Sequence, residues 1–89
     1  MQQKNIVIIN KLGLHARAAA KLIAVTSRFS SAITLEKDGR EVDGKSIMSV
    51  MMLAAAKGTT LTVTTTGSDE ESALAAIEEL INNRFDEDE

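Results

Sequence analysis

The sequence predicts an α+β fold in which three helices cover one face of a four-stranded antiparallel sheet. Strand-like runs of β-branched or alternating residues take turns with stretches of helical spacing, in the order β-α-β-β-α-β-α. An Asp-Gly pair between the second and third strand-like runs is typical of a hairpin, which makes those strands antiparallel. Since each helix has an apolar stripe to bury, a shared face of the sheet is the economical arrangement. The threonines of the last strand indicate that the other face contacts water.

The first strand and the first helix are joined by a short loop. Residues 6–9 are a β-branched run typical of a buried strand, and residues 10–13, which end in glycine, indicate the loop. A helix is expected over about residues 16–27. Its apolar face is formed by Ala16, Ala19, Ala20 and Ile23, widened by Leu22, Val25 and Phe29.

A hairpin follows this helix. Residues 32–36 alternate between apolar and polar side chains, as expected for a strand with one buried face. Asp38 and Gly39 tolerate the left-handed conformation that a tight turn needs. Residues 40–43 then return as a short antiparallel strand.

A short helix is predicted after the hairpin. Ser46 is placed to cap it, because a serine hydroxyl can accept a hydrogen bond from a free backbone N–H of the first turn. The helix is expected to run to about Ala55, where Lys57 supplies a cation and Gly58 a stop.

The last strand and the last helix complete the order. Residues 61–65 alternate as a fourth strand that ends at Gly67. Ser68 and Glu71 form a predicted capping box, in which each side chain accepts a hydrogen bond from the backbone N–H of the other residue. The apolar face of the long helix that follows consists of Leu74, Ile77, Ile81 and Phe85.

Residues 86–89 are all acidic and follow the helix end that the macrodipole makes unfavourable for negative charge. They are therefore expected to fray as a solvated tail, and no function is assigned to them. The chain has no Pro- or Ser-rich linker, and 44% of its 89 residues are hydrophobic. A single domain, 1–89, is expected.

Composition excludes several classes of function. The chain has no Cys, so disulfides and thiolate metal sites are ruled out and a reducing compartment fits. Its apolar runs are too short to span a bilayer and its first residues lack the pattern of a signal peptide, so a cytoplasmic protein without membrane insertion is expected. A net charge of −3 with two aromatic residues and no basic cluster argues against nucleic acid. One histidine and no glycine-rich phosphate loop leave too few ligands for a metal or nucleotide cofactor. Protein partners are favoured.

His15, the only histidine, lies where the loop gives way to the first helix. A neutral imidazole carries a nucleophilic nitrogen near physiological pH, and the first N–H groups of a helix have no intrahelical partner. The backbone N–H groups of Ala16 and Arg17, the helix dipole and the Arg17 guanidinium can together hold phosphoryl oxygens. The loop contains no carboxylate. The alternatives are a histidine that only caps the helix or packs in the core, and an arginine that is only a solvated surface residue.

The second helix carries a candidate regulatory and docking surface. Ser46 is either an ordinary cap or a phosphorylation site, since added phosphate at a helix start would alter docking without unfolding the chain. Methionines at helical spacing are more often core residues, but a flexible exposed methionine surface suits a protein with several partners. The methionines are divided here, with Met48 and Met51 rather than Met52 at the interface. The predicted partner-binding residues are Ile47, Met48, Met51 and Ala20.

Residues 10–17 (NKLGLHAR), 44–51 (GKSIMSVM) and 55–58 (AAKG) resemble the corresponding motifs of HPr, the phosphocarrier family of the bacterial phosphoenolpyruvate-dependent sugar phosphotransferase system. The resemblance covers nearly the whole chain and implies an open-faced β-sandwich. It implies a monomeric phosphoryl carrier, not an enzyme, that accepts a phosphoryl group on Nδ1 of His15 from enzyme I. It also implies transfer onward to sugar-specific IIA components, and phosphorylation of Ser46 by a dedicated HPr serine kinase/phosphorylase.

The chain departs from the family pattern in its first helix. Many members have proline directly after the arginine, where this chain has Ala18, and some have lysines where Ala24 and Ser27 stand. Without the proline the unfolded chain is less restricted, which lowers the free energy of unfolding by about 0.5–1 kcal/mol. The chemistry of the site is expected to remain intact. The alternative function is a regulatory binding protein of the same fold, controlled through Ser46 or belonging to the nitrogen branch, although residues 44–46 favour the sugar branch.

Overall fold

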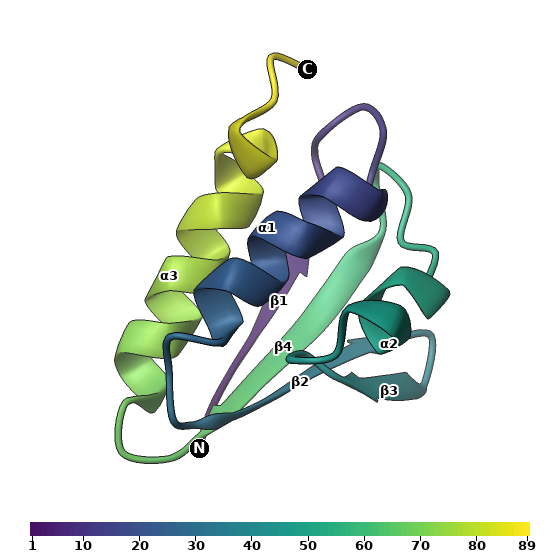
Figure 1. Cartoon of the computed structure of the whole chain (residues 1–89). Coiled ribbons are helices and arrows are strands. Elements are labelled where there is room, and N and C mark those ends of the chain that lie inside the picture. Colours follow the sequence, from purple (N-terminus) through teal and green to yellow (C-terminus); the bar gives the residue numbers. More distant parts are fainter.

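The computed structural model describes all 89 residues and confirms the predicted fold class and element order. Four antiparallel strands form one sheet in the order β1-β4-β2-β3, and three helices cover one face of it (Figure 1). The elements are β1 (Gln2–Val7), α1 (Ala16–Thr26), β2 (Ala32–Lys37), β3 (Arg40–Asp43), α2 (Ile47–Met52), β4 (Thr60–Thr66), α3 (Glu70–Asn82) and a 3₁₀ turn, η1 (Arg84–Asp86).

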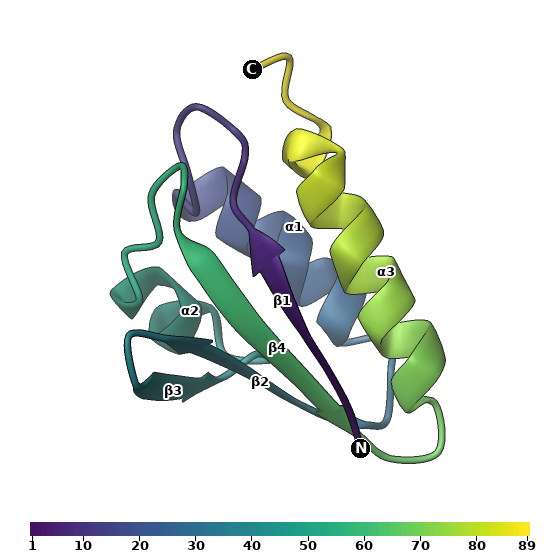
Figure 2. The ribbon, with the colours of Figure 1, turned by 180° about the vertical axis from the view of Figure 1, so that it is seen from behind.

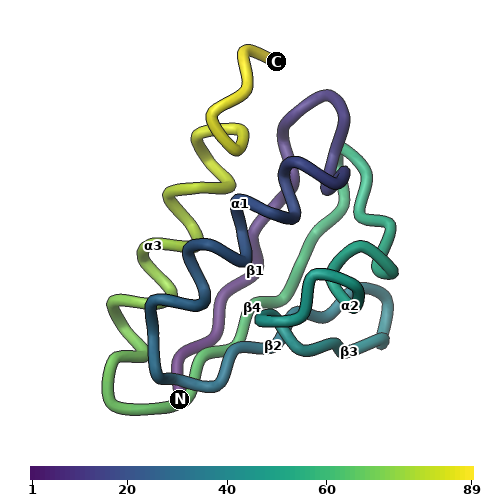
Figure 3. Tube along the Cα trace, in the orientation of Figure 1, coloured from purple at the N-terminus to yellow at the C-terminus, as the bar shows by residue number.

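The helices divide the covered face between them. α1 and α3 lie side by side over β1 and β4, while α2 lies near β2 and β3 (Figures 1 and 3). Between helices and sheet lies a core of 17 buried apolar residues, the largest of which is Phe85. The arrangement brings residues 86–89 close to the loop that follows β1, although the two segments are far apart in sequence (Figure 3).

The opposite face of the sheet carries no helix (Figure 2). Residues of β4 that point toward the helices and are buried are Leu61, Val63 and Thr65. On the open face, the Thr62 hydroxyl donates to Oδ1 of Asn5 at 2.8 Å, a polar pair between neighbouring strands. The threonines of β4 are expected to contact water, but Thr65 is buried on the helix side of the sheet. Its hydroxyl donates to the Glu70 carbonyl at 2.8 Å.

β1 differs from the predicted strand in its bounds and its burial. It begins at Gln2 and ends at Val7, whereas the apolar run predicted residues 6–9. Ile6 and Ile8 are buried but Val7 is 45% exposed, so the run is not buried on both sides. The reason is that β1 is an edge strand of a sheet with one open face, and pairing with β4 rather than apolar continuity sets its limits.

α1 agrees with prediction in extent but not in its buried face. Ala16 and Ala20, which the helical spacing places on the buried face, are both exposed, although Ala20 is also a predicted docking residue. The buried residues are Ala18, Ala19, Leu22 and Thr26. Alanines occupy several sides of this helix, so their spacing does not mark a face, and the large Leu22 side chain sets the orientation instead. The Thr26 hydroxyl donates to the Gly44 carbonyl at 2.9 Å and ties the helix end to the hairpin.

α2 starts at the predicted cap, because the Ser46 hydroxyl accepts a backbone N–H of the first turn at 3.3 Å. It ends earlier than predicted. The left-handed residue after the helix is Ala54 (φ 51°), and the expected stop at Lys57 and Gly58 lies in the following loop. Packing against the loop after β1 ends the helix before it reaches these residues. Ala55 is buried, and its carbonyl oxygen accepts the N–H of Leu14.

The predicted capping box of Ser68 and Glu71 is wrong. The N-cap of α3 is Asp69, and its carboxylate reaches across to the loop before β2. There it accepts the N–H groups of Ser30 and Ser31, at 2.9 and 3.0 Å, and the Ser31 hydroxyl. Hydrogen bonds from the Ser31 hydroxyl and the Ser30 N–H lower the pKa of Asp69 to about 2. A contact between elements, which local sequence does not report, therefore sets this end of α3.

α3 ends before Phe85, which the pattern placed on the helix face. The buried helix residues are Ala73, Ile77 and Ile81, with Leu74 partly buried. Beyond Asn82 the chain turns through residues with positive φ, and this turn directs Phe85 into the core. Residues 86–89, for which charge predicts fraying, lie against the loop after β1 and make the contacts described next.

Candidate functional site

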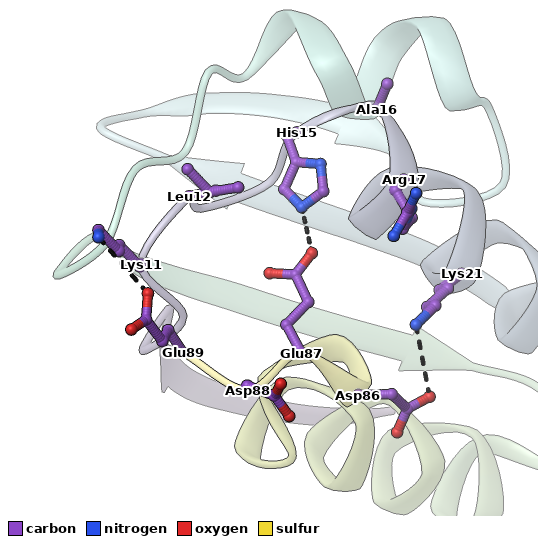
Figure 4. A pocket seen from close by; sticks show the side chains of 10 residues that line it. All are labelled: Lys11, Leu12, His15, Ala16, Arg17, Lys21, Asp86, Glu87, Asp88 and Glu89. Carbon is purple, nitrogen blue, oxygen red and sulfur yellow. Dashed lines mark hydrogen bonds and ion pairs between the residues drawn. The ribbon is translucent and has the colours of Figure 1, made fainter.

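A pocket forms where three segments meet: the loop after β1, the first two turns of α1 and the segment after α3 (Figure 4). Its lining is strongly polar, with cations from the first two segments and carboxylates from the third. The lining residues are Lys11, Leu12, His15, Ala16, Arg17, Lys21, Asp86, Glu87, Asp88 and Glu89.

Gly13 positions the loop that carries the histidine. Its φ is +66°, and a Cβ at this position would lie 2.6 Å from the Ala55 carbonyl oxygen. Next to it, the Leu14 N–H donates to the same carbonyl at 2.8 Å, and the Leu14 side chain is buried. Only glycine accommodates both the left-handed conformation and this close approach. The loop is thereby fixed against the α2–β4 connection, with His15 at the start of α1.

His15 occupies the N-cap position of α1, but its side chain makes no capping hydrogen bond. The imidazole is 28% exposed, so it is neither a capping group nor a core side chain. The His15 carbonyl accepts the Ala19 N–H at 2.8 Å, the first bond of the helix. The N–H groups of Ala16 and Arg17 have no intrahelical partner, and both residues are exposed beside the ring.

A carboxylate from the other end of the chain contacts the imidazole. The loop has none of its own, but the fold brings Glu87, 72 residues away, against Nε2 of His15 (Figure 4). Oε1 of the same carboxylate accepts Nδ2 of Asn10 at 2.9 Å. The Asn10 hydrogen bond, followed by the contact with His15, lowers the pKa of Glu87, while desolvation opposes the shift. Glu87 is therefore ionised at neutral pH.

Asn10 joins this network to the loop. It is fully buried, and its Nδ2 also donates to the Gly13 carbonyl at 2.8 Å. Its Oδ1 has no hydrogen-bond partner. Sequence analysis identified neither Asn10 nor Glu87 as a site residue. The sequence places Asn10 in a loop and Glu87 in a uniformly acidic run, and no local pattern connects positions so far apart.

The cations of the pocket differ in how they are engaged. Lys21, which sequence analysis also missed, donates to the Phe85 carbonyl at 2.8 Å and lies 3.9 Å from the Asp86 carboxylate. Its position one helical turn after Arg17 is the signal that could have identified it. Lys11 pairs with Glu89 at 3.4 Å in an exposed contact. Arg17, by contrast, forms no ion pair and is free to bind an anion at the start of α1.

The predicted docking residues are exposed on α1 and α2. α2 packs against α1, and Ser46 caps α2 through the Ser49 N–H. The exposed apolar side chains are Ile47, Met48, Met51 and Met52 of α2 and Leu12 of the His15 loop. Met52 is exposed as well, so exposure does not separate it from Met48 and Met51, and the division of the methionines stays a prediction. Ala20 is exposed on α1. Leu12 was not predicted, because the sequence shows a leucine three residues before the histidine but not that it is exposed.

The structure contains no group of three or more His, Cys, Asp or Glu side chains arranged to hold a metal ion. None of its helices combines the length and the apolar character needed to cross a membrane.

Comparison with known proteins agrees with the geometry. Residues 2–83 match the family described as "PTS HPr component phosphorylation site". The phosphocarrier protein HPr of Pseudomonas aeruginosa is 57% identical over 90 residues, which cover all of both chains. A crystal structure of HPr-C-His from Thermoanaerobacter tengcongensis superposes with a TM-score of 0.97 at 43% identity, covering all of both chains. Another, described as an HPr dimer from the same organism, gives a TM-score of 0.79 at 44% identity and covers 98% of this chain and 100% of that one. This chain belongs to the HPr family of phosphocarrier proteins of the phosphotransferase system.

Proposed function

We propose that the phosphoryl acceptor of this carrier is Nδ1 of His15, with enzyme I as the donor and IIA components of sugar permeases as the next acceptors. The observation that carries the proposal is the partly exposed imidazole at the start of α1, beside the unpartnered N–H groups of Ala16 and Arg17. Such a helix start attracts phosphate through both its N–H groups and its dipole. The donor in this proposal is a phosphoenolpyruvate-dependent protein, so the carrier is expected to act in the cytoplasm.

The transfer step follows from these positions. The Nδ1 lone pair forms a bond to the phosphorus while the donor's bond to the same phosphorus breaks and its electron pair returns to the donor. The proton on Nε2 stays, so the phosphorylated ring carries a positive charge. The Ala16 and Arg17 N–H groups and the Arg17 guanidinium face the phosphoryl oxygens. The chain is a carrier rather than an enzyme, because it is itself modified and is restored only when an acceptor takes the group.

Intact-mass measurement tests the proposal. Incubation with enzyme I and phosphoenolpyruvate is expected to add one phosphoryl group that is lost in acid and kept in alkali, because a P–N bond becomes labile when the ring is protonated. His15→Ala is expected to add none. Acid-labile incorporation into His15→Ala would contradict the assignment.

Ser46 is proposed as the regulatory phosphorylation site, acting on the docking surface formed by Ile47, Met48 and Met51. The support is its place at the start of α2, where it is only partly buried and lies next to these exposed side chains. A phosphate there would add about −1.5 to −2 charges within the surface that partners must approach. An HPr serine kinase/phosphorylase is the partner that this site requires.

The carrier is proposed to act as a monomer, since its docking surface has to be free for successive partners. A related chain has been crystallised as a dimer, so the oligomeric state is open to a direct test. Light scattering before and after phosphorylation is expected to give the mass of one chain, and a stable dimer that phosphorylates at the same rate would contradict this part of the proposal.

A further inference from the structure

A chain of hydrogen bonds connects the His15 loop to Glu87 and back to the imidazole. Nδ2 of Asn10 donates both to the Gly13 carbonyl, at 2.8 Å, and to Oε1 of Glu87, at 2.9 Å. The other oxygen, Oε2, contacts Nε2 of His15. None of these contacts involves the Ala16 and Arg17 N–H groups that the proposed function uses, so the chain needs an explanation of its own.

The orientation of each member fixes the next. An amide nitrogen has two N–H groups and no lone pair to offer, so the Gly13 carbonyl and the Glu87 carboxylate both require Nδ2, and not Oδ1, to face them. Turning the Asn10 amide over would place Oδ1 against the Gly13 oxygen. The observed orientation leaves Oδ1 buried without a partner. The two hydrogen bonds that Nδ2 donates therefore outweigh the cost of leaving this one acceptor unsatisfied.

The donor in the hydrogen bond between Nε2 of His15 and Oε2 of Glu87 decides where the ring proton lies. Oε1 of Glu87 is occupied by Asn10, and an ionised carboxylate can only accept. Nε2 of His15 must therefore be the donor, and in the neutral ring the lone pair is then on Nδ1. A histidine without such a partner interconverts between both tautomers, and only one of them has a free Nδ1.

We propose that Glu87, oriented by Asn10, is a positioning residue that holds the proton of the neutral His15 ring on Nε2 and so keeps Nδ1 available as the nucleophile. The inference rests on the proposed function in taking Nδ1 as the reacting atom. When Nδ1 bonds to phosphorus, the donor's bond to phosphorus breaks, the Nε2 proton stays, and the positive charge on the ring faces the Glu87 carboxylate. The same pairing of a carboxylate with the non-reacting nitrogen orients the histidine of Ser-His-Asp enzymes.

An opposite role for the same contact is that the acidic segment blocks the pocket. Residues 86–89 bring negative charge beside a site for an anion, and such charge repels an incoming phosphoryl group. Glu87, however, faces Nε2, which is on the other side of the ring from the reacting bond to Nδ1. The positioning role predicts slower phosphorylation when Glu87 is replaced, whereas the blocking role predicts faster phosphorylation.

The tautomer of the ring provides a direct test that needs no partner protein. In Glu87→Gln, the Asn10 N–H still requires an acceptor, so the Gln oxygen faces Asn10 and the Gln NH₂ faces His15. Nε2 must then accept, and the proton moves to Nδ1. The ¹⁵N shifts of the two ring nitrogens, recorded at alkaline pH so that the ring is neutral, are expected to show the Nε2–H form in the natural chain and the Nδ1–H form in Glu87→Gln. Glu87→Ala is expected to give a mixture.

A matched control removes the same charge from the same pocket. Glu89→Gln alters an exposed carboxylate that pairs with Lys11 and does not contact the imidazole. It is expected to keep the Nε2–H form. A purely structural role for the tail, or a general effect of its negative charge, would make Glu87→Gln and Glu89→Gln behave alike, and that result would overturn the proposal.

Phosphorylation kinetics complete the test. With enzyme I in catalytic amount, Glu87→Gln is expected to lower the rate at saturating carrier by about tenfold or more, because the reactive tautomer is depleted, and to leave the KM for the carrier nearly unchanged. An unchanged tautomer or a faster reaction in Glu87→Gln would overturn the positioning role. If the natural chain takes up no acid-labile phosphoryl group, the proposed function fails instead, and the ¹⁵N shifts still report whether Glu87 holds the tautomer.

Discussion

Arg17 and Lys21 are one turn apart on α1 and are engaged differently. Lys21 is held by the Phe85 carbonyl, so its charge is partly committed to the segment after α3. Arg17 has no ion-pair partner and lies at the helix start beside His15. A guanidinium that is free in the unmodified chain can form its bonds with the phosphoryl group that we propose His15 accepts.

Arg17→Ala is therefore expected to slow phosphoryl transfer about tenfold or more, because a hydrogen bond to a charged group contributes about 1.5–3 kcal/mol. The fold should be unaffected, since the side chain is exposed and contributes no core packing. Rapid-quench measurement of transfer from enzyme I and to a IIA component checks the rate, and far-UV circular dichroism checks the fold. Equal rates for the two proteins in both directions would make Arg17 an ordinary surface residue.

Among the elements, α2 combines an N-cap, Ser46, with an exposed apolar surface on its six helical residues. Ser46→Asp should preserve the cap, because aspartate is as good an N-cap as serine, while it adds a negative charge next to Ile47 and Met48. Ser46→Asn is the matched control, since asparagine caps a helix equally well and adds no charge.

We expect Ser46→Asp to raise the KM of enzyme I for this carrier at low salt and Ser46→Asn to leave it unchanged. The difference should shrink as salt is raised, because an exposed charge is screened over a Debye length of about 10 Å at 0.1 M. Steady-state phosphorylation at low and high ionic strength provides the comparison. A KM for Ser46→Asp equal to that of the natural chain at low salt would remove the support for regulation at Ser46.

The start of α3 predicts how stability depends on pH. The Asp69 carboxyl has a pKa of about 2 in the folded chain, lowered from 3.8 by hydrogen bonds from Ser31 and Ser30. Since the folded-state pKa is the lower one, this carboxylate stabilises the fold fully above the unfolded-state value, and the contribution is lost as pH falls from about 4 to 2.

Thermal unfolding followed by circular dichroism at pH 5, 4, 3 and 2 is expected to show Tm falling over this range in the natural chain. Asp69→Asn should have a lower Tm at pH 5 and a smaller fall, because its amide does not titrate. Parallel curves for the two proteins would assign the acid sensitivity to other carboxyls.

At the level of the whole molecule, local patterns were sufficient for what neighbouring residues determine. The hairpin at Asp38 and Gly39 follows from two residues that both adopt positive φ, and the start of α2 follows from one serine. The order of elements and the antiparallel pairing of β2 with β3 follow in the same way. His15 and Arg17 could be singled out because loop and helix start are adjacent in sequence.

What could not be predicted depends on contacts between distant segments. The cap of α3 is Asp69 because the loop before β2 supplies its donors, and no spacing within α3 reveals that. α1 could not be oriented from its alanines, which are equally small on every side. Glu87 belongs to an acidic run that looks uniform in sequence, and only the turn that buries Phe85 selects it to face the histidine.

The turn at Phe85 also sets an order of events during biosynthesis. At about 5–20 residues per second, the 72 residues that separate His15 from Glu87 take roughly 4–14 s to synthesise. β1 cannot pair until β4 has been made, and the core is not filled until Phe85 arrives. His15 is thus translated well before the segment that completes its surroundings. A nascent chain that does not yet include Glu87 presents an imidazole without its carboxylate, and the surroundings of His15 are complete only once the turn at Phe85 has folded.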